Sequence, residues 1–437
     1  MNIRKLALEL LLEYELGDKY VNLSLSSHKA DNLSPKERGM LTSLLYTTVE
    51  HKLTYDYYIS SLAKREIAKL DPYTHNALRI GLAQIVDISS VPDFAAVNET
   101  VKLARGAGER AFINGVLRAA VKNKDSLPLP PEEKNYKRYL SVKYSFPLAT
   151  VKLFDSLYGR EGCERLLLAF SQQNYTDLFV NTMKISVDDF LDKLRSFGIT
   201  AKRNGSVENS VRIDGSADAR RIPGFSEGEF FVQDLASTVA SLALGAREGD
   251  TVVDVCSCPG DKSFASAILS SDKADIRSFD LHESKLSLIE SGKGRLGLSS
   301  IKVRALDATT PDESLFGTAD KVICDAPCSG LGVLSKKPDL RYKDVTALDS
   351  LYPLQYSILE SSVKYLRRGG VLLYSTCTLN PRENGEIVDR FLAENGEFEA
   401  CDFTVGGFSS ENGRLTLLPH IHNTDGFFMC KIRKKEI

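Results

Sequence analysis

Tryptophan is absent from the 437 residues, and histidine is scarce, with six residues. The eight cysteines show no CxxC spacing and no histidine cluster beside them, so the sequence offers no zinc motif and we expect no metal. They also lack the framework spacing of a disulfide-rich secreted protein. No apolar run approaches the length of a transmembrane helix, and no signal peptide opens the chain. We therefore expect a cytoplasmic protein without membrane contact.

Charge of one sign is not in excess either. The chain carries 56 Lys+Arg against 58 Asp+Glu, a formal net charge of −2, which excludes a global field that attracts nucleic acid. The balance is uneven, because residues 1–150 hold 21 basic and 17 acidic residues, a net of +4, which leaves −6 for the remainder. This mild basic bias of the N-terminal part is compatible with RNA contact.

Amphipathic periodicity with few β-branched clusters predicts an all-helical domain over residues 1–125. After a first helix near the N-terminus, helices are expected at 36–52, 54–69, 73–87, 94–105 and 108–123. Ser34-Pro35-Lys36-Glu37 is typical of a capped helix start with proline at the first helical position. Three prolines then mark a linker over 126–135. Residues 136–222 mix helix-like and strand-like segments, which predicts a small, RRM-like α+β subdomain.

Strand–turn–helix repeats occupy residues 223–437 and predict an α/β domain with a parallel, doubly wound sheet. Its strands are expected at 251–255, 276–280, 301–306, 321–325 and 371–375. In such sheets, ligands bind at the carboxyl ends of the strands. The residues just after each predicted strand are therefore the candidates for a functional site.

The first three of these strand ends suggest a nucleoside cofactor. The first leads into Cys256-Ser-Cys-Pro-Gly-Asp-Lys262, whose Pro-Gly turn directs backbone N–H groups toward an anionic group. There is no GxGxxG, so a dinucleotide fingerprint is absent. The next two strands end in Asp280, which suits ribose hydroxyls, and Asp307, which suits an adenine amino group. Each aspartate alone is more often a turn residue, but their recurrence favours S-adenosylmethionine, a nucleoside with a carboxylate-bearing tail.

Two cysteines follow later strand ends, Cys328 in Asp325-Ala-Pro-Cys328 and Cys377 in Ser375-Thr-Cys377. A thiolate that adds to carbon 6 of cytosine makes carbon 5 nucleophilic enough to accept a methyl group. A proton or hydrogen bond at ring nitrogen 3 aids this addition, and Asp325 is placed to supply it. The proton on carbon 5 must then leave, a step that a second cysteine can assist. The remaining cysteines at 163, 401 and 430 are expected to be inert packing.

These residues carry a family resemblance. Asp325–Cys328, Ser375–Cys377, the Pro259–Lys262 loop and Asp425–Phe428 together resemble the motifs of the NOL1/NOP2/Sun RNA cytosine-5 methyltransferases. Val232–Ser237 resembles the family segment ahead of the cofactor loop. The N-terminal part, including Phe112–Leu117, resembles a NusB-like RNA-binding domain. The resemblance covers nearly the whole chain, and the pairing of domains is similar to that of a bacterial 16S rRNA enzyme of the family.

The resemblance implies a Rossmann-like methyltransferase domain behind an all-α NusB-like domain, with the α+β subdomain between them. It implies methyl transfer from S-adenosylmethionine to carbon 5 of a specific cytidine in 16S rRNA, and the target base must be single-stranded or flipped out. Cys377 is implied as the nucleophile and Cys328 as the residue that assists release, with Asp325 in support. The implied cofactor-binding residues are Cys256, Ser257, Cys258, Pro259, Gly260, Asp261, Lys262, Asp280, Asp307 and Asp325.

The chain departs from the family at Asp261, where the family has glycine. We expect this side chain to turn outward and cap the following helix. Lys337–Arg341 also resembles a family segment near the active site, without an assigned role.

Alternatives stay open. A non-catalytic RNA-binding factor for assembly or antitermination would fit the NusB-like part, although retention of both strand-end cysteines with Asp325 and Lys262 argues against it. A DNA cytosine-5 methyltransferase would use the cysteine of the Pro-Cys motif instead, and a tRNA-directed enzyme would share the chemistry. Lys134–Lys143 interleaves cations with tyrosines and is either a phosphate-and-stacking surface or, as we favour, a solvated face. A monomer is expected.

Overall fold

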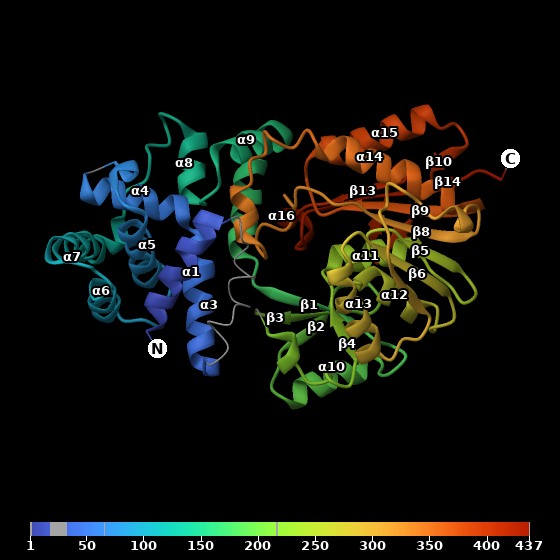
Figure 1. The fold of residues 1–437 in the computed structure, drawn as a ribbon, viewed down its shortest axis with the longest axis horizontal. Helices are drawn as coiled ribbons and strands as arrows, with labels where there is room; N and C mark the ends of the chain where they lie inside the picture. The colour runs from blue at the N-terminus through green and yellow to red at the C-terminus, as the bar shows by residue number, and fades with distance from the viewer. Residues whose placement is uncertain (1, 18–32, 65, 216, 437) are drawn as a thin grey trace. The chain divides into compact units, whose positions relative to one another are not determined.

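The computed structural model describes residues 2–17, 33–64, 66–215 and 217–436. The chain divides into two compact units (Figure 1). The first consists of residues 1–171 and 334–345, and the second of residues 172–333 and 346–437. The chain thus leaves the second unit after residue 333, contributes a short segment to the first, and returns at residue 346.

The first unit is helical. Its helices are α1 (Ile3–Gly17), α3 (Pro35–Glu50), α4 (Lys52–Ala63), α5 (Pro72–Val86), α6 (Asp93–Val101), α7 (Ala107–Lys122), α8 (Tyr136–Lys143) and α9 (Leu148–Gln172), the last of which ends at the boundary between the units. The apolar faces predicted from the sequence meet in one core, which includes the buried Leu6, Leu10 and Leu11 of α1. The predicted start of α3 is confirmed as a full capping box, with reciprocal hydrogen bonds between Ser34 and Glu37.

The predicted helix over 54–69 is wrong at its end. Helix α4 stops at Ala63 because Lys64 adopts a left-handed conformation with φ of 49°. A short 3-10 turn, Ile67–Lys69, follows before α5. The periodicity of apolar residues continues across this break, which explains the overextended prediction.

The second unit begins with a small antiparallel sheet in the order β2-β3-β1-β4. Its strands are β1 (Tyr175–Val180), β2 (Ala201–Arg203), β3 (Ser210–Asp214) and β4 (Phe230–Val232). Helix α10 (Val187–Ser196) packs Phe190 and Leu194 against this sheet. Strands β1, β2 and β3 and helix α10 lie within residues 136–222, where the sequence indicates strand-like and helix-like segments, whereas β4 was not predicted.

The larger sheet has the strand order β10-β14-β9-β8-β5-β6-β7. Strands β5 (Thr251–Asp254), β6 (Asp275–Asp280), β7 (Ile301–Ala305), β8 (Ala319–Asp325) and β9 (Leu366–Thr376) pair in parallel, as predicted. The antiparallel strands β14 (Phe427–Lys434), β10 (Phe398–Ala400) and β13 (Arg414–Leu417), which extend this sheet at one end, were not predicted.

Helices cover both faces of this sheet, as a doubly wound fold requires. Helices α11 (Leu235–Leu244), α12 (Asp261–Leu269) and α13 (Glu283–Leu296) contribute to the core on one face, and α14 (Leu351–Ser362) and α15 (Gly385–Glu394) to that on the other. Neighbouring residues of β5 point to opposite faces, because Val252 lies in the first core and Val253 in the second. The sheet is therefore buried on both sides.

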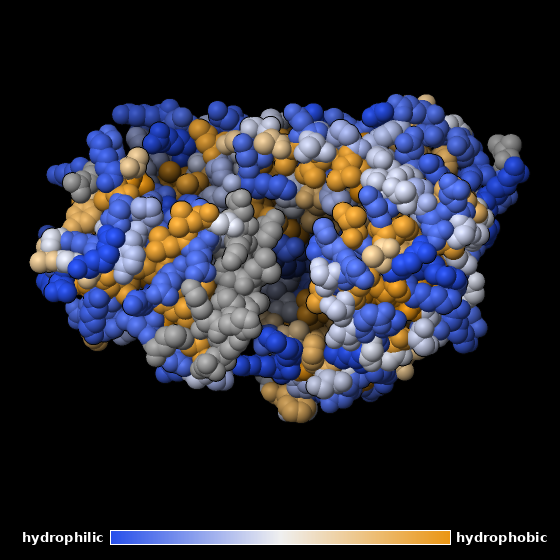
Figure 2. Space-filling view, in the orientation of Figure 1, coloured by the Kyte–Doolittle hydropathy of each residue, from blue (hydrophilic) through white to orange (hydrophobic). Residues whose placement is uncertain are grey.

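The surface view in Figure 2 shows hydrophilic residues over most of the face, with hydrophobic residues interspersed among them. Over the described ranges, no helix combines the length and apolarity that crossing a membrane requires.

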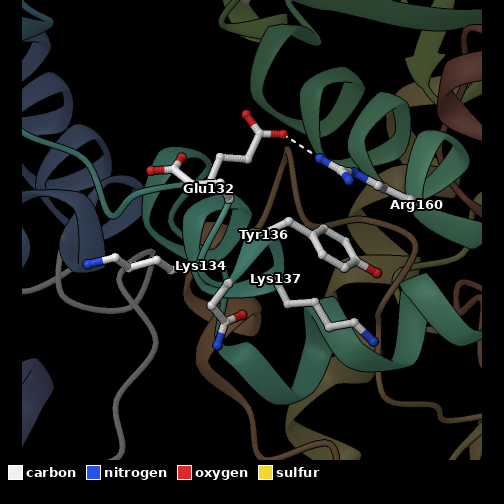
Figure 3. A pocket seen from close by; sticks show the side chains of 7 residues that line it. Glu132, Lys134, Tyr136, Lys137 and Arg160 are labelled. Atoms are coloured by element: carbon white, nitrogen blue, oxygen red, sulfur yellow. Dashed lines mark hydrogen bonds and ion pairs between the residues drawn. The ribbon is translucent and has the colours of Figure 1, made fainter.

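The basic and aromatic segment 134–143 forms α8 and the residue pair before it. The cations around Tyr136 are engaged within the first unit: Lys137 pairs with Asp155 at 2.5 Å, and Arg160 pairs with Glu132 at 2.6 Å. Figure 3 shows Tyr136 beside Lys137 and Arg160, and the Arg160 guanidinium lies 4.7 Å from the centre of its ring. These internal contacts favour the interpretation of this segment as a solvated face.

Candidate active site

The order of the parallel strands reverses between β5 and β8, and both strands end at the same edge of the sheet. Ligands of doubly wound sheets bind outside the carboxyl ends of strands at such a point. The loop after β5 contains residues 255–260, the loop after β8 contains Cys328, and the loop after β9 begins with Cys377. The predicted cofactor and catalytic residues therefore converge on this edge.

The loop after β5 turns sharply into α12. Gly260 has φ of 112°, and a Cβ on it would lie 2.5 Å from the ring of Phe264, so the close turn requires glycine. The loop is fastened to β6, because the Ser257 hydroxyl donates to the Phe279 carbonyl at 2.9 Å. Lys262 follows in the first turn of α12, with its side chain buried.

Asp280 and Asp307 lie at the ends of β6 and β7, as predicted. The Asp280 carboxylate accepts hydrogen bonds from the backbone N–H groups of Cys258 at 3.2 Å and His282 at 3.0 Å. Asp307 is exposed and accepts from the backbone N–H and hydroxyl of Thr309 at 2.8 and 2.7 Å. Both aspartates thus organise local turns, and each carboxylate keeps lone pairs for further hydrogen bonds.

The predicted capping role of Asp261 is wrong. Gly260 occupies the cap position, and Asp261 is the first residue of α12. Its carboxylate accepts hydrogen bonds from the Gln233 amide at 3.1 Å and the Ser237 hydroxyl at 2.9 Å. Both partners come from the predicted segment ahead of the cofactor loop, so Asp261 ties that segment to the loop instead of turning outward.

Lys262 forms a short ion pair with Asp325 at the end of β8. The Lys262 ammonium lies 2.7 Å from one carboxylate oxygen, and the Ser375 hydroxyl donates to the other at 2.6 Å. Burial alone would lower the pKa of Lys262, but the carboxylates of Asp261 and Asp325 outweigh it and raise that pKa. The pair therefore presents a protonated ammonium beside a carboxylate.

Asp254, the last residue of β5, is fully buried behind this loop. Burial raises its pKa to about 7. One carboxylate oxygen accepts from the Ser263 hydroxyl at 2.7 Å, and the other has no hydrogen-bond partner among the described residues. Such an unsatisfied polar atom is uncommon in protein interiors and occurs at functional sites.

The two strand-end cysteines are brought together. Their sulfur atoms lie 3.3 Å apart, within hydrogen-bonding distance. This follows from strand pairing, because β8 and β9 are neighbours with Asp325 opposite Ser375. The hydrogen bond to Cys377, together with burial, raises the pKa of Cys328 well above its ordinary value.

Other cysteines are poorly suited to nucleophilic attack. Burial raises the pKa of the thiols of Cys163, Cys324 and Cys430 to about 12 in each case. Burial likewise raises the pKa of Cys256, and burial with the Asp280 carboxylate raises that of Cys258 to about 12. A thiol is reactive as the thiolate, so these residues are inert at neutral pH.

A backbone junction supports the cysteine pair. The N–H of Gly332 donates to the carbonyl of Cys377 at 2.9 Å, and the N–H of Gly426 donates to the carbonyl of Gly332 at 2.8 Å. A Cβ on Gly332 would lie 1.8 Å from the Gly426 carbonyl oxygen. The segment Asp425–Phe428 therefore belongs to the site because its glycine allows this close approach.

No role was predicted from the sequence for the buried polar residues that support the two cysteines. Glu383, Ser329 and Thr378 hydrogen-bond to one another directly behind the thiols. The available signal was position, because Ser329 and Thr378 each follow a cysteine and Glu383 lies six residues after Cys377. Lys337–Arg341 lies within the first unit, where the Arg341 side chain is fully buried.

Together, the doubly wound sheet, the glycine turn that leads to Lys262 and the paired thiols at the strand ends are features of the class of α/β methyltransferases. Comparison with known proteins identifies the family. Residues 241–433 match the model described as 16S rRNA methyltransferase RsmB/F, and residues 1–122 match the NusB family. The chain is 34% identical to the probable ribosomal RNA small subunit methyltransferase B of Bacillus subtilis (strain 168), over 99% of both chains. It is 32% identical to the protein described in the same words from Synechocystis, over 99% of this chain and 100% of that one.

The chain therefore belongs to the ribosomal RNA small subunit methyltransferase B family, which confirms the predicted recognition and fold class. The fold is also found in solved structures. The crystal structure of PH0851 covers 99% of this chain and 98% of that one, with a TM-score of 0.79 and 25% identity. NSun6 from Pyrococcus horikoshii with SFG matches 67% of this chain and 99% of that one, with a TM-score of 0.59 and 22% identity.

Proposed function

We propose that the chain transfers a methyl group from S-adenosylmethionine to carbon 5 of a specific cytidine in 16S rRNA, through a covalent cysteine–cytosine adduct. One observation carries this proposal: the thiols of Cys328 and Cys377 lie 3.3 Å apart beside the Lys262–Asp325 pair. The relatives named ribosomal RNA small subunit methyltransferase B support the substrate class.

The residues of the cofactor loop fit S-adenosylmethionine. Residues 256–262 would hold its amino-acid end, Asp280 the ribose and Asp307 the adenine, in the order in which β5, β6 and β7 lie side by side. The glycine turn at Gly260 and the unsatisfied oxygen of Asp254 lie at the start of this row. When bound, this cofactor supplies an electrophilic methyl group on a sulfonium.

Cys377 is the proposed nucleophile. Because the raised pKa of Cys328 keeps that thiol protonated, Cys328 can donate its hydrogen to the Cys377 sulfur and stabilise a thiolate there. The thiolate forms a bond to carbon 6, and the Lys262–Asp325 pair supplies a proton or strong hydrogen bond at ring nitrogen 3. The resulting enamine makes carbon 5 nucleophilic.

Cys328 is proposed to assist release. Once Cys377 is a thioether, its sulfur is a weaker hydrogen-bond partner for the Cys328 thiol, so the largest cause of the raised Cys328 pKa is weakened while burial still raises it. Cys328 passes its proton to solvent before it acts as the base. Cys328 then takes the proton from carbon 5. The electron pair of that C–H bond re-forms the 5,6 double bond, and the sulfur–carbon bond breaks with its electron pair on Cys377.

The test is methyl transfer from labelled S-adenosylmethionine to protein-free 16S rRNA, followed by analysis of the nucleosides. The parent should place label in 5-methylcytidine, and Cys377→Ala should place none. Cys328→Ala should accumulate a protein–RNA adduct that resists denaturation, because addition loses only the hydrogen bond from Cys328 and is slowed, whereas release loses its base. Label at another atom, or full activity of Cys377→Ala, would contradict the proposal.

A control separates the substrate alternatives. If the parent binds the cofactor but labels no rRNA, tRNA and the small ribosomal particle are tested next under the same conditions. Label in tRNA alone would favour the tRNA-directed activity. Absence of label in all three would favour a non-catalytic RNA-binding role.

A further inference from the structure

Glu383 is a buried carboxylate behind the two cysteines. It ends a short 3-10 turn, Pro381–Glu383, that follows β9, and its side chain is fully excluded from solvent. Its hydrogen-bond donors are hydroxyl, amide and backbone N–H groups. Burying a carboxylate is costly unless hydrogen bonds replace the lost water, so the carboxylate depends on this set of donors.

The donors come from both cysteine loops. One carboxylate oxygen accepts from the hydroxyls of Ser329 at 2.5 Å and Thr378 at 3.1 Å, and from the Asn380 amide at 3.1 Å. The other accepts from the backbone N–H of Ser329 at 2.7 Å and from the Gln355 amide at 3.0 Å. Glu383 thus connects the loop after β8, the loop after β9 and helix α14.

The attachment points are next to the thiols. Ser329 directly follows Cys328, and Thr378 directly follows Cys377. Their hydroxyl oxygens also lie 2.8 Å apart, so the two hydroxyls and one carboxylate oxygen form a closed triangle. Because each hydroxyl has one proton, two of the three sides are hydrogen bonds at a time. A movement of either cysteine loop by even 1 Å would break at least one side of this triangle.

The backbone of Glu383 is fixed as well. Its carbonyl accepts a hydrogen bond from the buried Tyr374 hydroxyl at 2.7 Å. The neighbouring Asn384 accepts from the Thr376 hydroxyl at 2.5 Å and donates to the Thr378 carbonyl at 2.9 Å, one bond on each side of Cys377. The turn that presents the carboxylate is therefore built on the strand end that presents the nucleophile.

We propose that Glu383 is a positioning residue that sets the spacing and relative orientation of the Cys328 and Cys377 thiols. The inference rests on the proposed function for the meaning of that spacing, but the spacing can be measured without methyl transfer. Glu383 acts through Ser329 and Thr378 and does not touch the reacting atoms.

Glu383→Gln is the principal variant, because it keeps the size of the side chain. An amide offers one oxygen, so it can satisfy one edge of the donor set and must oppose a donor at the other. Glu386→Gln is the matched control, because Glu386 is an exposed residue three positions further along the same segment. Each variant therefore removes one carboxylate: Glu383→Gln removes the one that the donors surround, and Glu386→Gln removes one outside this set of donors.

Two measurements test the proposal on the full-length protein. Diamide takes two hydrogens from a pair of thiols and leaves a disulfide, and the rate at which the Cys328–Cys377 linked peptide appears in mass spectra reports their geometry. We expect this rate to fall about tenfold in Glu383→Gln and kcat to fall between about tenfold and a hundredfold, because small displacements of reacting groups cost that much. KM for both substrates should change by less than about twofold, since positioning acts after binding.

A second pair of variants keeps the test decisive if Glu383→Gln does not fold. Thr378→Val removes the hydroxyl at nearly constant size, whereas Thr378→Ser keeps a hydroxyl at this position. We expect slow cross-linking in the first and parental cross-linking in the second.

Equal cross-linking rates in Glu383→Gln and Glu386→Gln, or in the two Thr378 variants, would overturn the proposal. A slowed rate in Glu383→Gln supports the positioning role even if Cys377→Ala proves active, which would contradict only the proposed chemistry.

Discussion

At the scale of residues, the roles of the two cysteines depend on where the proton between them lies. The hydrogen bond to Cys377, followed by burial, raises the pKa of Cys328. A raised thiol pKa means less thiolate at any pH below it, so Cys328 should react slowly with electrophiles near neutral pH. We expect iodoacetamide to modify Cys377 before Cys328 at pH 7, as measured by mass spectrometry of the alkylated peptides.

The raised pKa of Cys328 also predicts how its alkylation depends on pH. In the parent, alkylation of Cys328 should increase only as the pH rises toward its raised pKa. In Cys377→Ala the hydrogen bond that contributes most to that shift is lost, so the alkylation profile of Cys328 should move to lower pH. An unchanged profile in the variant would show that burial alone sets the reactivity of Cys328.

Single residues of the site could be predicted from the sequence where they end or closely follow a parallel strand, because that position places them at the ligand-binding edge of the sheet. Asp280, Asp325, Cys328 and Cys377 are of this kind, because parallel strands end at one edge. No role was predicted for Glu383, since its position after Cys377 is a weak signal and its importance lies in the donors that surround it after folding. Asp261 was misplaced for a related reason: its partners, Gln233 just before α11 and Ser237 on it, are distant in the sequence, and a capping rule considers only neighbours.

At the scale of elements, local periodicity predicted the helices of the first unit up to residue 122, apart from the end of α4, and the parallel strands closely. It did not predict β14 as a partner of β9, because antiparallel pairing over some 50 residues leaves no local signal. Yet β14 follows directly on Gly426, whose N–H bonds to Gly332 in the Cys328 loop. The unpredicted strand thus fixes one side of the candidate site.

Gly332 tests this junction of elements. A methyl group in Gly332→Ala would lie 1.8 Å from the Gly426 carbonyl and 2.8 Å from the Cys377 carbonyl, both backbone atoms. The loops must therefore separate, which we expect to cost roughly 1–3 kcal/mol of stability, the range for overpacked sites. Methyl transfer should fall by at least about tenfold, because the displacement occurs beside Cys377, the proposed nucleophile.

Gly385→Ala is the control for Gly332→Ala, because a Cβ on Gly385 would have no atom within 4 Å. Urea unfolding and methyl-transfer rates should distinguish the two variants. Parental activity in Gly332→Ala would show that the contact between the loops is dispensable.

At the scale of the whole molecule, one unit is built from two separate segments of the chain, which sequence patterns did not predict. Residues 334–345 leave the α/β unit and complete the helical unit. Arg341 is fully buried there, with its guanidinium 2.9 Å from the Glu50 carboxylate and 4.5 Å from the centre of the Phe146 ring. It also donates to the carbonyls of Leu334 at 3.0 Å and Phe170 at 3.3 Å. A segment that resembles a family segment near the active site is therefore a structural part of the helical unit.

Arg341→Met should destabilise the helical unit. The substitution fills most of the space but leaves Glu50 without its partner and two buried carbonyls without their donor, a loss of roughly 2–4 kcal/mol. Hydrogen exchange should accelerate in α3 and α9, which supply Glu50 and Phe170, and remain parental in β5–β9. Arg367→Met is the control, because Arg367 pairs with Asp320 at a half-exposed site in the α/β unit. Equal protection of α3 and α9 in the two variants would mean that residues 334–345 add no stability to the helices, and that the helical unit is complete without them.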